Sequence, residues 1–142
     1  MFAAYRNHAS AYRRLDVETS VDAANPHKLI AMLYDGAIAA MQRARAAIGQ
    51  GDVAGKCEAV TRAIRIVDEG LKASLDPAGG VLATRLRDLY EYVSRRLLVV
   101  SLRGDLEALD ESIALIGGLR DAWVQIAPSG QPARAGVAAY AA

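Results

Sequence analysis

Two histidines are the side chains best suited to metal binding or phosphoryl transfer in this chain, at His8 and His27. A di-metal site in a helical bundle uses Glu-x-x-His pairs inside the core, and neither histidine follows a carboxylate at that spacing. His27 follows Pro26 in the first turn of an expected helix, whereas a phosphotransfer histidine would be exposed in mid-helix. The sequence therefore predicts no metal site and no cofactor, and a phosphotransfer protein ranks well below the alternatives.

The single cysteine, Cys57, is the only candidate thiol nucleophile. It falls within a helical apolar pattern, where a free cysteine usually acts as a small buried hydrophobic residue. One cysteine forms no intrachain disulfide and suits the reducing cytoplasm. The glycine clusters end helical patterns instead of opening them after a strand, so they do not predict a phosphate-binding loop. We expect a protein that is not an enzyme.

Paired arginines at 13–14 and 95–96 are the residues that could contact nucleic acid. The chain has 17 Lys and Arg against 16 Asp and Glu, a net charge of +1, which is unlike the clear positive excess of nucleic-acid-binding domains. We expect no nucleic acid as partner. Membrane insertion is not expected either, because no uncharged apolar stretch approaches the ~20 residues of a membrane span. The N-terminus carries no signal-peptide pattern.

The elements that position these residues are predicted to be helices. The chain of 142 residues is 53% apolar but only 6% aromatic, and this balance favours helix over a β-sandwich or barrel. Asn25-Pro26 has the residue types of a helix start, and Gly-rich breaks near 49–51, 76–80 and 104 separate apolar patterns with spacings of three and four. Four helices are expected, at about 26–48, 52–75, 81–103 and 105–126.

Helices of similar length with short connections predict an all-α fold, an antiparallel up-down four-helix bundle over 25–127. An N-terminal leader over 1–24 is expected to be either an arm packed on the bundle or a mobile tail, and 128–142 a disordered C-terminal tail. The apolar face of each predicted helix is wider than helix–helix contacts in a four-helix bundle require. The surplus either widens the core or forms an exposed groove for a partner helix.

Three sequence blocks resemble the flagellar secretion chaperone FliS family. They are ANPHKLIAMLYDGAI at 24–38, LYEYVSRRL at 89–97 followed by Gly104-Asp105, and LRDAW at 119–123. The leader agrees as well, with Ala11-Tyr12 and the Val-Glu-Thr of 17–19. The blocks occur in the right order at the right spacing, from about Tyr12 to Ile126.

The resemblance implies a cytoplasmic export chaperone. Such a protein binds the C-terminal segment of newly made flagellin, prevents premature polymerisation and delivers flagellin to the flagellar type III export apparatus. In the family the leader is thought to lie over part of the binding surface and to move aside. On this interpretation the leader contacts are Tyr12, Leu15 and Val17, and the partner-binding residues are Ile30, Tyr34, Leu98, Val99, Leu102 and Leu115.

Two alternatives stay open at this point. A non-enzymatic helical adaptor or signalling module could use the same apolar surplus to bind another partner helix. A homodimer could bury the same surface against a second copy of the chain. Binding to flagellin with and without its C-terminal segment distinguishes the chaperone from the adaptor.

Overall fold

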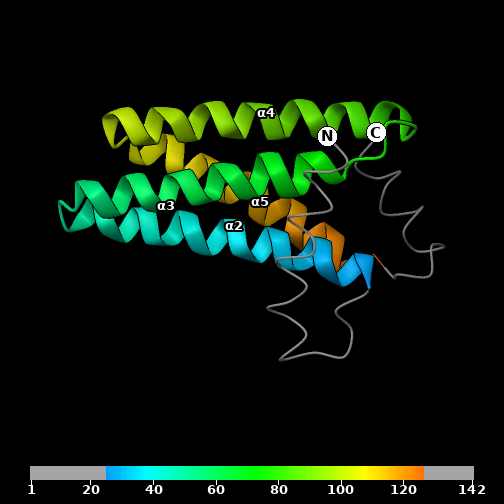
Figure 1. Ribbon diagram of the computed structural model, residues 1–142, viewed down its shortest axis with the longest axis horizontal. Helices are drawn as coiled ribbons and strands as arrows, with labels where there is room; N and C mark the ends of the chain where they lie inside the picture. Colours follow the sequence, from blue (N-terminus) through cyan, green and yellow to red (C-terminus); the bar gives the residue numbers. More distant parts are fainter. Residues whose placement is uncertain (1–24, 127–142) are drawn as a thin grey trace.

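The computed structural model describes residues 25–126 of the chain. Four long helical stretches follow one another: α2 (Pro26–Gly49), α3 (Val53–Arg65) with its extension η1 (Ile66–Leu71) and η2 (Lys72–Ser74), α4 (Gly80–Arg103) and α5 (Leu106–Gln125). Figure 1 shows that successive stretches run in opposite directions along the long axis of the molecule. The predicted all-α, four-helix fold is confirmed. The predicted leader and tail, with Tyr12, Leu15 and Val17, lie outside the described residues.

The helix starts follow from side-chain caps that the sequence places there. Asn25 Oδ1 accepts a hydrogen bond from the His27 backbone N–H at 2.9 Å, and Pro26 occupies the first helical position. Asp52 and Asp105 cap α3 and α5 in the same way, each accepting from a backbone N–H three residues ahead. At the other end of α4, Gly104 adopts φ +63°, a left-handed conformation that glycine enters without the penalty of a Cβ.

The four helices form a ring in which each contacts two neighbours. Helix α2 packs against α3 and α5, and α4 packs against α3 and α5. Small side chains on α2 let its neighbours approach closely, while leucine, isoleucine and valine from the other helices fill the interior. The largest fully buried side chains are Tyr90, Met41, Ile66, Leu71, Leu97, Leu109 and Ile116. Among residues 25–126, no helix is both long and apolar enough to cross a membrane.

The second helix changes form at Ile66, which its apolar pattern does not predict. Residues Ile66–Leu71 make a π-helix, and Lys72–Ser74 a single 3₁₀ turn. Gly70 lies against α2 here, because a Cβ at this position would stand only 3.0 Å from Leu33 Cδ2. The lack of a side chain therefore lets the π-helical segment pack directly on α2.

Candidate partner-binding surface

Two leucines on α4 remain exposed although the bundle is folded. Leu98 is 52% exposed and Leu102 is 81% exposed. The buried residues of α4 include Tyr90, Val93 and Leu97, so the core-facing side of this helix is already occupied. Leu98 and Leu102 are four residues apart, so they lie on one side of the helix, away from the side that faces the core. Exposed large apolar side chains at this spacing are suited to receive the apolar face of another helix.

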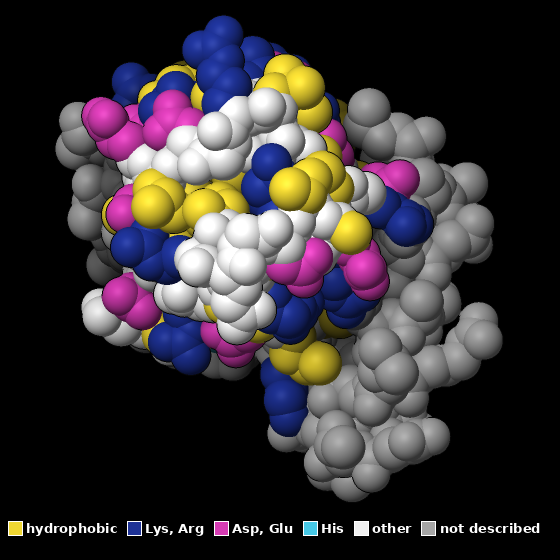
Figure 2. Space-filling model, turned by 90° about the vertical axis from the view of Figure 1, so that its left-hand side faces the viewer, with side chains coloured by type: hydrophobic (Ala, Val, Ile, Leu, Met, Phe, Trp, Pro, Cys, Tyr) yellow, Lys and Arg dark blue, Asp and Glu magenta, His cyan; other side chains and the backbone are white. Residues whose placement is uncertain are grey.

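Val53 extends this surface across to α3. The Ser101 hydroxyl approaches the Cys57 sulfur at 3.9 Å, which sets the end of α4 beside the start of α3. Val53, the first residue of α3, is 65% exposed, and Leu106, the first residue of α5, is also exposed. We call Val53, Leu98, Leu102 and Leu106 the end patch. Figure 2 looks onto this end of the molecule and shows hydrophobic side chains at the surface among charged ones.

The other predicted partner contacts are less accessible. Ile30, Val99 and Leu115 are half-buried and pack against the core. Tyr34 is wrong as a surface contact: it is 3% exposed, and its hydroxyl lies 2.6 Å from that of Tyr90 on α4. Because α2 faces two neighbouring helices, the buried side of α2 is broad enough to include Tyr34 beside Leu33.

Val53 and Leu106 were missed by the sequence analysis. Val53 continues the apolar pattern of α3, but it stands at the exposed first turn of that helix. Leu106 has the same position in α5, directly after the Asp105 cap. The signal that could have found both is their place directly after an aspartate of N-cap type, since a first helical turn at the end of a bundle has few neighbours.

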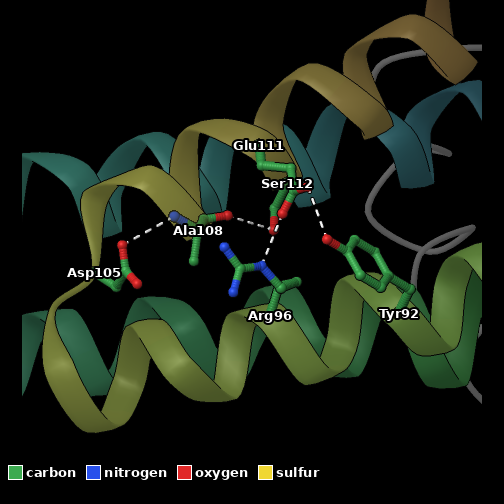
Figure 3. A network of polar contacts seen from close by, with 6 residues as sticks. All are labelled: Tyr92, Arg96, Asp105, Ala108, Glu111 and Ser112. Carbon is green, nitrogen blue, oxygen red and sulfur yellow. Dashed lines mark hydrogen bonds and ion pairs between the residues drawn. The ribbon is translucent and has the colours of Figure 1, made fainter.

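A polar network joins α4 to α5 (Figure 3). Tyr92 Oη donates to Glu111 Oε2 at 2.7 Å, and Arg96 Nε donates to Glu111 Oε1 at 2.8 Å. These two hydrogen bonds, first that from Tyr92, hold the pKa of the Glu111 carboxyl below its ordinary value. Arg96 is therefore half-buried and paired with Glu111, whereas Arg95 of that arginine pair is exposed.

His27 and Trp123 close the opposite end of the bundle. Their rings stack with centroids 4.7 Å apart, and Trp123 Nε1 donates to the His27 carbonyl at 2.8 Å. His27 Nε2 lies 3.0 Å from the Trp123 carbonyl. Both side chains thus hold the start of α2 to the end of α5. Cys57 is half-buried, and residues 25–126 contain no group of His, Cys, Asp or Glu that could hold a metal ion.

The known proteins to which this chain is similar agree on one family. A family described as "Flagellar protein FliS" matches residues 8–130. A "Flagellar secretion chaperone FliS" from Salmonella typhimurium is 50% identical over 119 residues, which cover 83% of this chain and 88% of that protein. Proteins of the same name from Escherichia coli and Bacillus subtilis are 38% and 31% identical, over 80% and 94% of this chain and 84% and 96% of their own lengths.

Proposed function

The chain belongs to the FliS family of flagellar secretion chaperones, and from this premise we propose that it binds the C-terminal segment of newly made flagellin. On this proposal, binding takes place in the cytoplasm, prevents premature polymerisation and precedes delivery to the flagellar type III export apparatus. No catalysis is needed, because occupying the adhesive segment of flagellin is enough to stop assembly.

The exposure of Leu98 and Leu102 is the observation that supports this role. A disordered segment that folds on binding must offset the entropy lost on ordering, and apolar burial is the main favourable contribution. Fully burying one leucine side chain contributes about 1.5–3 kcal/mol. The end patch offers three leucine side chains and one valine, each only partly buried, on a folded, pre-organised surface. An amphipathic helix of flagellin laid on the end patch would bury them together.

Co-purification tests the partner. Full-length flagellin and flagellin lacking its C-terminal segment are each mixed with the tagged chaperone at equal concentration. We expect only the full-length protein to bind. Undiminished binding of the truncated flagellin would contradict the proposal and favour a helical adaptor with another target.

A pair of substitutions tests the surface. Leu98→Ser with Leu102→Ser removes the two exposed leucines of α4, and we expect the flagellin affinity to fall at least tenfold from lost apolar burial. Val81→Ser with Val124→Ser is the matched control, because these exposed valines stand at the start of α4 and the end of α5, away from the end patch. If the two double variants bind flagellin with equal affinity, flagellin binds elsewhere on the chain.

The same patch also allows self-association. A homodimer that buries the end patch would hide Leu102, and flagellin would have to displace the second copy. Sedimentation velocity over a range of concentrations measures this directly. We expect any dimer to dissociate in the Leu98→Ser, Leu102→Ser variant and on adding flagellin.

A further inference from the structure

The two parts of α4 differ in how deeply they are buried. All buried side chains of this helix come from its later part: Tyr90, Val93, Ser94, Leu97 and Val100. Residues 80–89 contain no buried side chain, since Leu86 and Leu89 pack against the core but stay half-buried, and Val81 is 64% exposed. Because helices in proteins are stabilised mainly by packing of their apolar face, the first turns of α4 are held less firmly than the rest.

A cavity of about 470 Å³ lies between these first turns and the α3 extension. Ala83, Thr84 and Arg87 line it from α4, and residues of η1, η2 and the connection at 75–77 line it from the other side. Packed protein interiors contain few spaces larger than a water molecule. The first turns of α4 are therefore not packed directly on the element that faces them.

Beyond the cavity, two polar contacts fix α4 to the bundle. Ser94 Oγ donates to Asp68 Oδ1 of the π-helical segment at 2.7 Å. Lys72 Nζ of η2 lies 3.5 Å from Glu91 Oε2. Tyr90, directly before Glu91, is the first buried residue of the helix. The firmly held part of α4 thus begins at residue 90.

The polar contacts of Thr84 and Arg87 stay within α4. Thr84 Oγ1 donates to the Gly80 carbonyl at 3.2 Å, and Arg87 lies 4.0 Å from its neighbour Asp88. Gly79, which precedes the helix, supplies no side-chain cap, whereas side chains cap the starts of the other three α-helices of residues 25–126. The N–H groups of the first turn of α4 therefore lack the acceptor that stabilises the other helix starts.

Segments with few buried apolar contacts open at a lower free energy than the core of the same protein. We propose that residues 80–89 form a lid over the cavity, which unwinds and refolds as one unit while residues 90–103 stay packed in the bundle. Opening the lid widens the cavity and uncovers Leu86 and Leu89. The motion occurs in the free chain, so it does not depend on whether flagellin is the partner.

Amide hydrogen exchange, measured residue by residue by NMR on the whole chain, tests the lid. Fraying of the first helical turn alone would leave the amides at 84–89 protected, because each of them has an acceptor within the helix. We expect protection factors at 84–89 to be at least tenfold lower than at 93–99, with the change close to residue 90. Equal protection in the two ranges would overturn the proposal.

Two glycine substitutions provide a matched comparison. Arg87 and Arg95 are both exposed on α4, and replacing either by glycine weakens the helix to a similar extent. Circular dichroism checks that each variant is folded, and we expect both to have a lower thermal midpoint. Arg87→Gly should lower the protection at 84–89 about fourfold. Arg95→Gly should leave that protection within twofold, because opening the lid does not unwind residue 95.

The comparison also defines the contrary result. If Arg95→Gly lowers the protection at 84–89 as much as Arg87→Gly does, α4 opens only as a whole helix and the lid does not exist. Flagellin binding is measured separately, so loss of the lid proposal would leave the proposed function untouched, and the reverse holds as well.

Discussion

The hydroxyls of Tyr34 and Tyr90 meet at 2.6 Å across the diagonal of the bundle. Helices α2 and α4 are not neighbours in the ring, so this hydrogen bond links the two helices through the core itself. Burial, and secondarily the nearby Tyr34, raises the pKa of the Tyr90 hydroxyl well above its ordinary value. The Tyr90 hydroxyl therefore keeps its proton, and it makes a neutral polar contact with the Tyr34 hydroxyl in an apolar interior.

Removing one member of this pair should destabilise the bundle. Tyr34→Phe leaves the Tyr90 hydroxyl, which is 2% exposed, without its hydrogen-bond partner, at a cost of about 1–3 kcal/mol. Adding Tyr90→Phe should recover part of this loss, because a pair of apolar rings leaves no hydroxyl to satisfy. Urea unfolding followed by circular dichroism measures the two single variants and the double variant. A double variant as unstable as the sum of the two single variants would show that the hydroxyls are not coupled.

Glu111 should make stability depend on pH. Its pKa in the folded protein lies below the ordinary value of 4.5, because Tyr92 and Arg96 donate hydrogen bonds to the carboxylate. This contribution is fully present above the unfolded pKa and is lost as the pH falls through the folded pKa. We expect Glu111→Gln to flatten the acidic limb of a plot of thermal midpoint against pH. Glu107→Gln is the control, since Glu107 is exposed and joins no such network; an identical flattening there would contradict the assignment.

Trp123 is the single tryptophan, so its fluorescence reports on the closed end of the bundle. Trp123→Phe keeps an aromatic ring beside His27 but loses the indole hydrogen bond to the His27 carbonyl, and should cost about 1 kcal/mol. In the unaltered chain we expect tryptophan fluorescence and circular dichroism to show one common unfolding transition. An earlier fluorescence transition would mean that this end opens before the rest of the bundle.

Two glycine-to-alanine substitutions should have opposite effects. At Gly70 the new Cβ would stand 3.0 Å from Leu33, so the leucine must move and the bundle is expected to lose stability. At Gly117, in the middle of α5, no atom lies within 4 Å of the new Cβ, and higher helix propensity should add up to about 1 kcal/mol. Thermal unfolding of both variants provides the comparison. A gain at Gly70 would show that the close contact between the π-helical segment and α2 is dispensable.

The sequence predicted the helices well because their ends are local features. Asn25, Asp52 and Asp105 cap helices in the structure with their own side chains, and Gly104 ends one. Leu98 and Leu102 were also predicted as surface residues, since they lie beside an apolar pattern that was already complete.

The features that the sequence analysis did not predict correctly depend on packing between residues far apart in the sequence. Tyr34 stands one position from Leu33, and periodicity alone does not determine the rotation of a helix closely enough to distinguish core from surface there. The π-helical form of Ile66–Leu71 depends on contact with α2, which the pattern within one helix does not contain.

The stacked rings of His27 and Trp123 have a mechanical consequence. The described bundle begins at Asn25 and ends at Ile126, and both points adjoin this one ring pair. A pulling force applied at Asn25 and Ile126 would therefore enter the bundle at a single place and act across the contact between α2 and α5. In that geometry the contacts break one after another, as in a zipper, whereas helices pulled from opposite ends must shear along their whole length. We expect the bundle to unfold at low force from this end, and the end patch to be the last part disturbed.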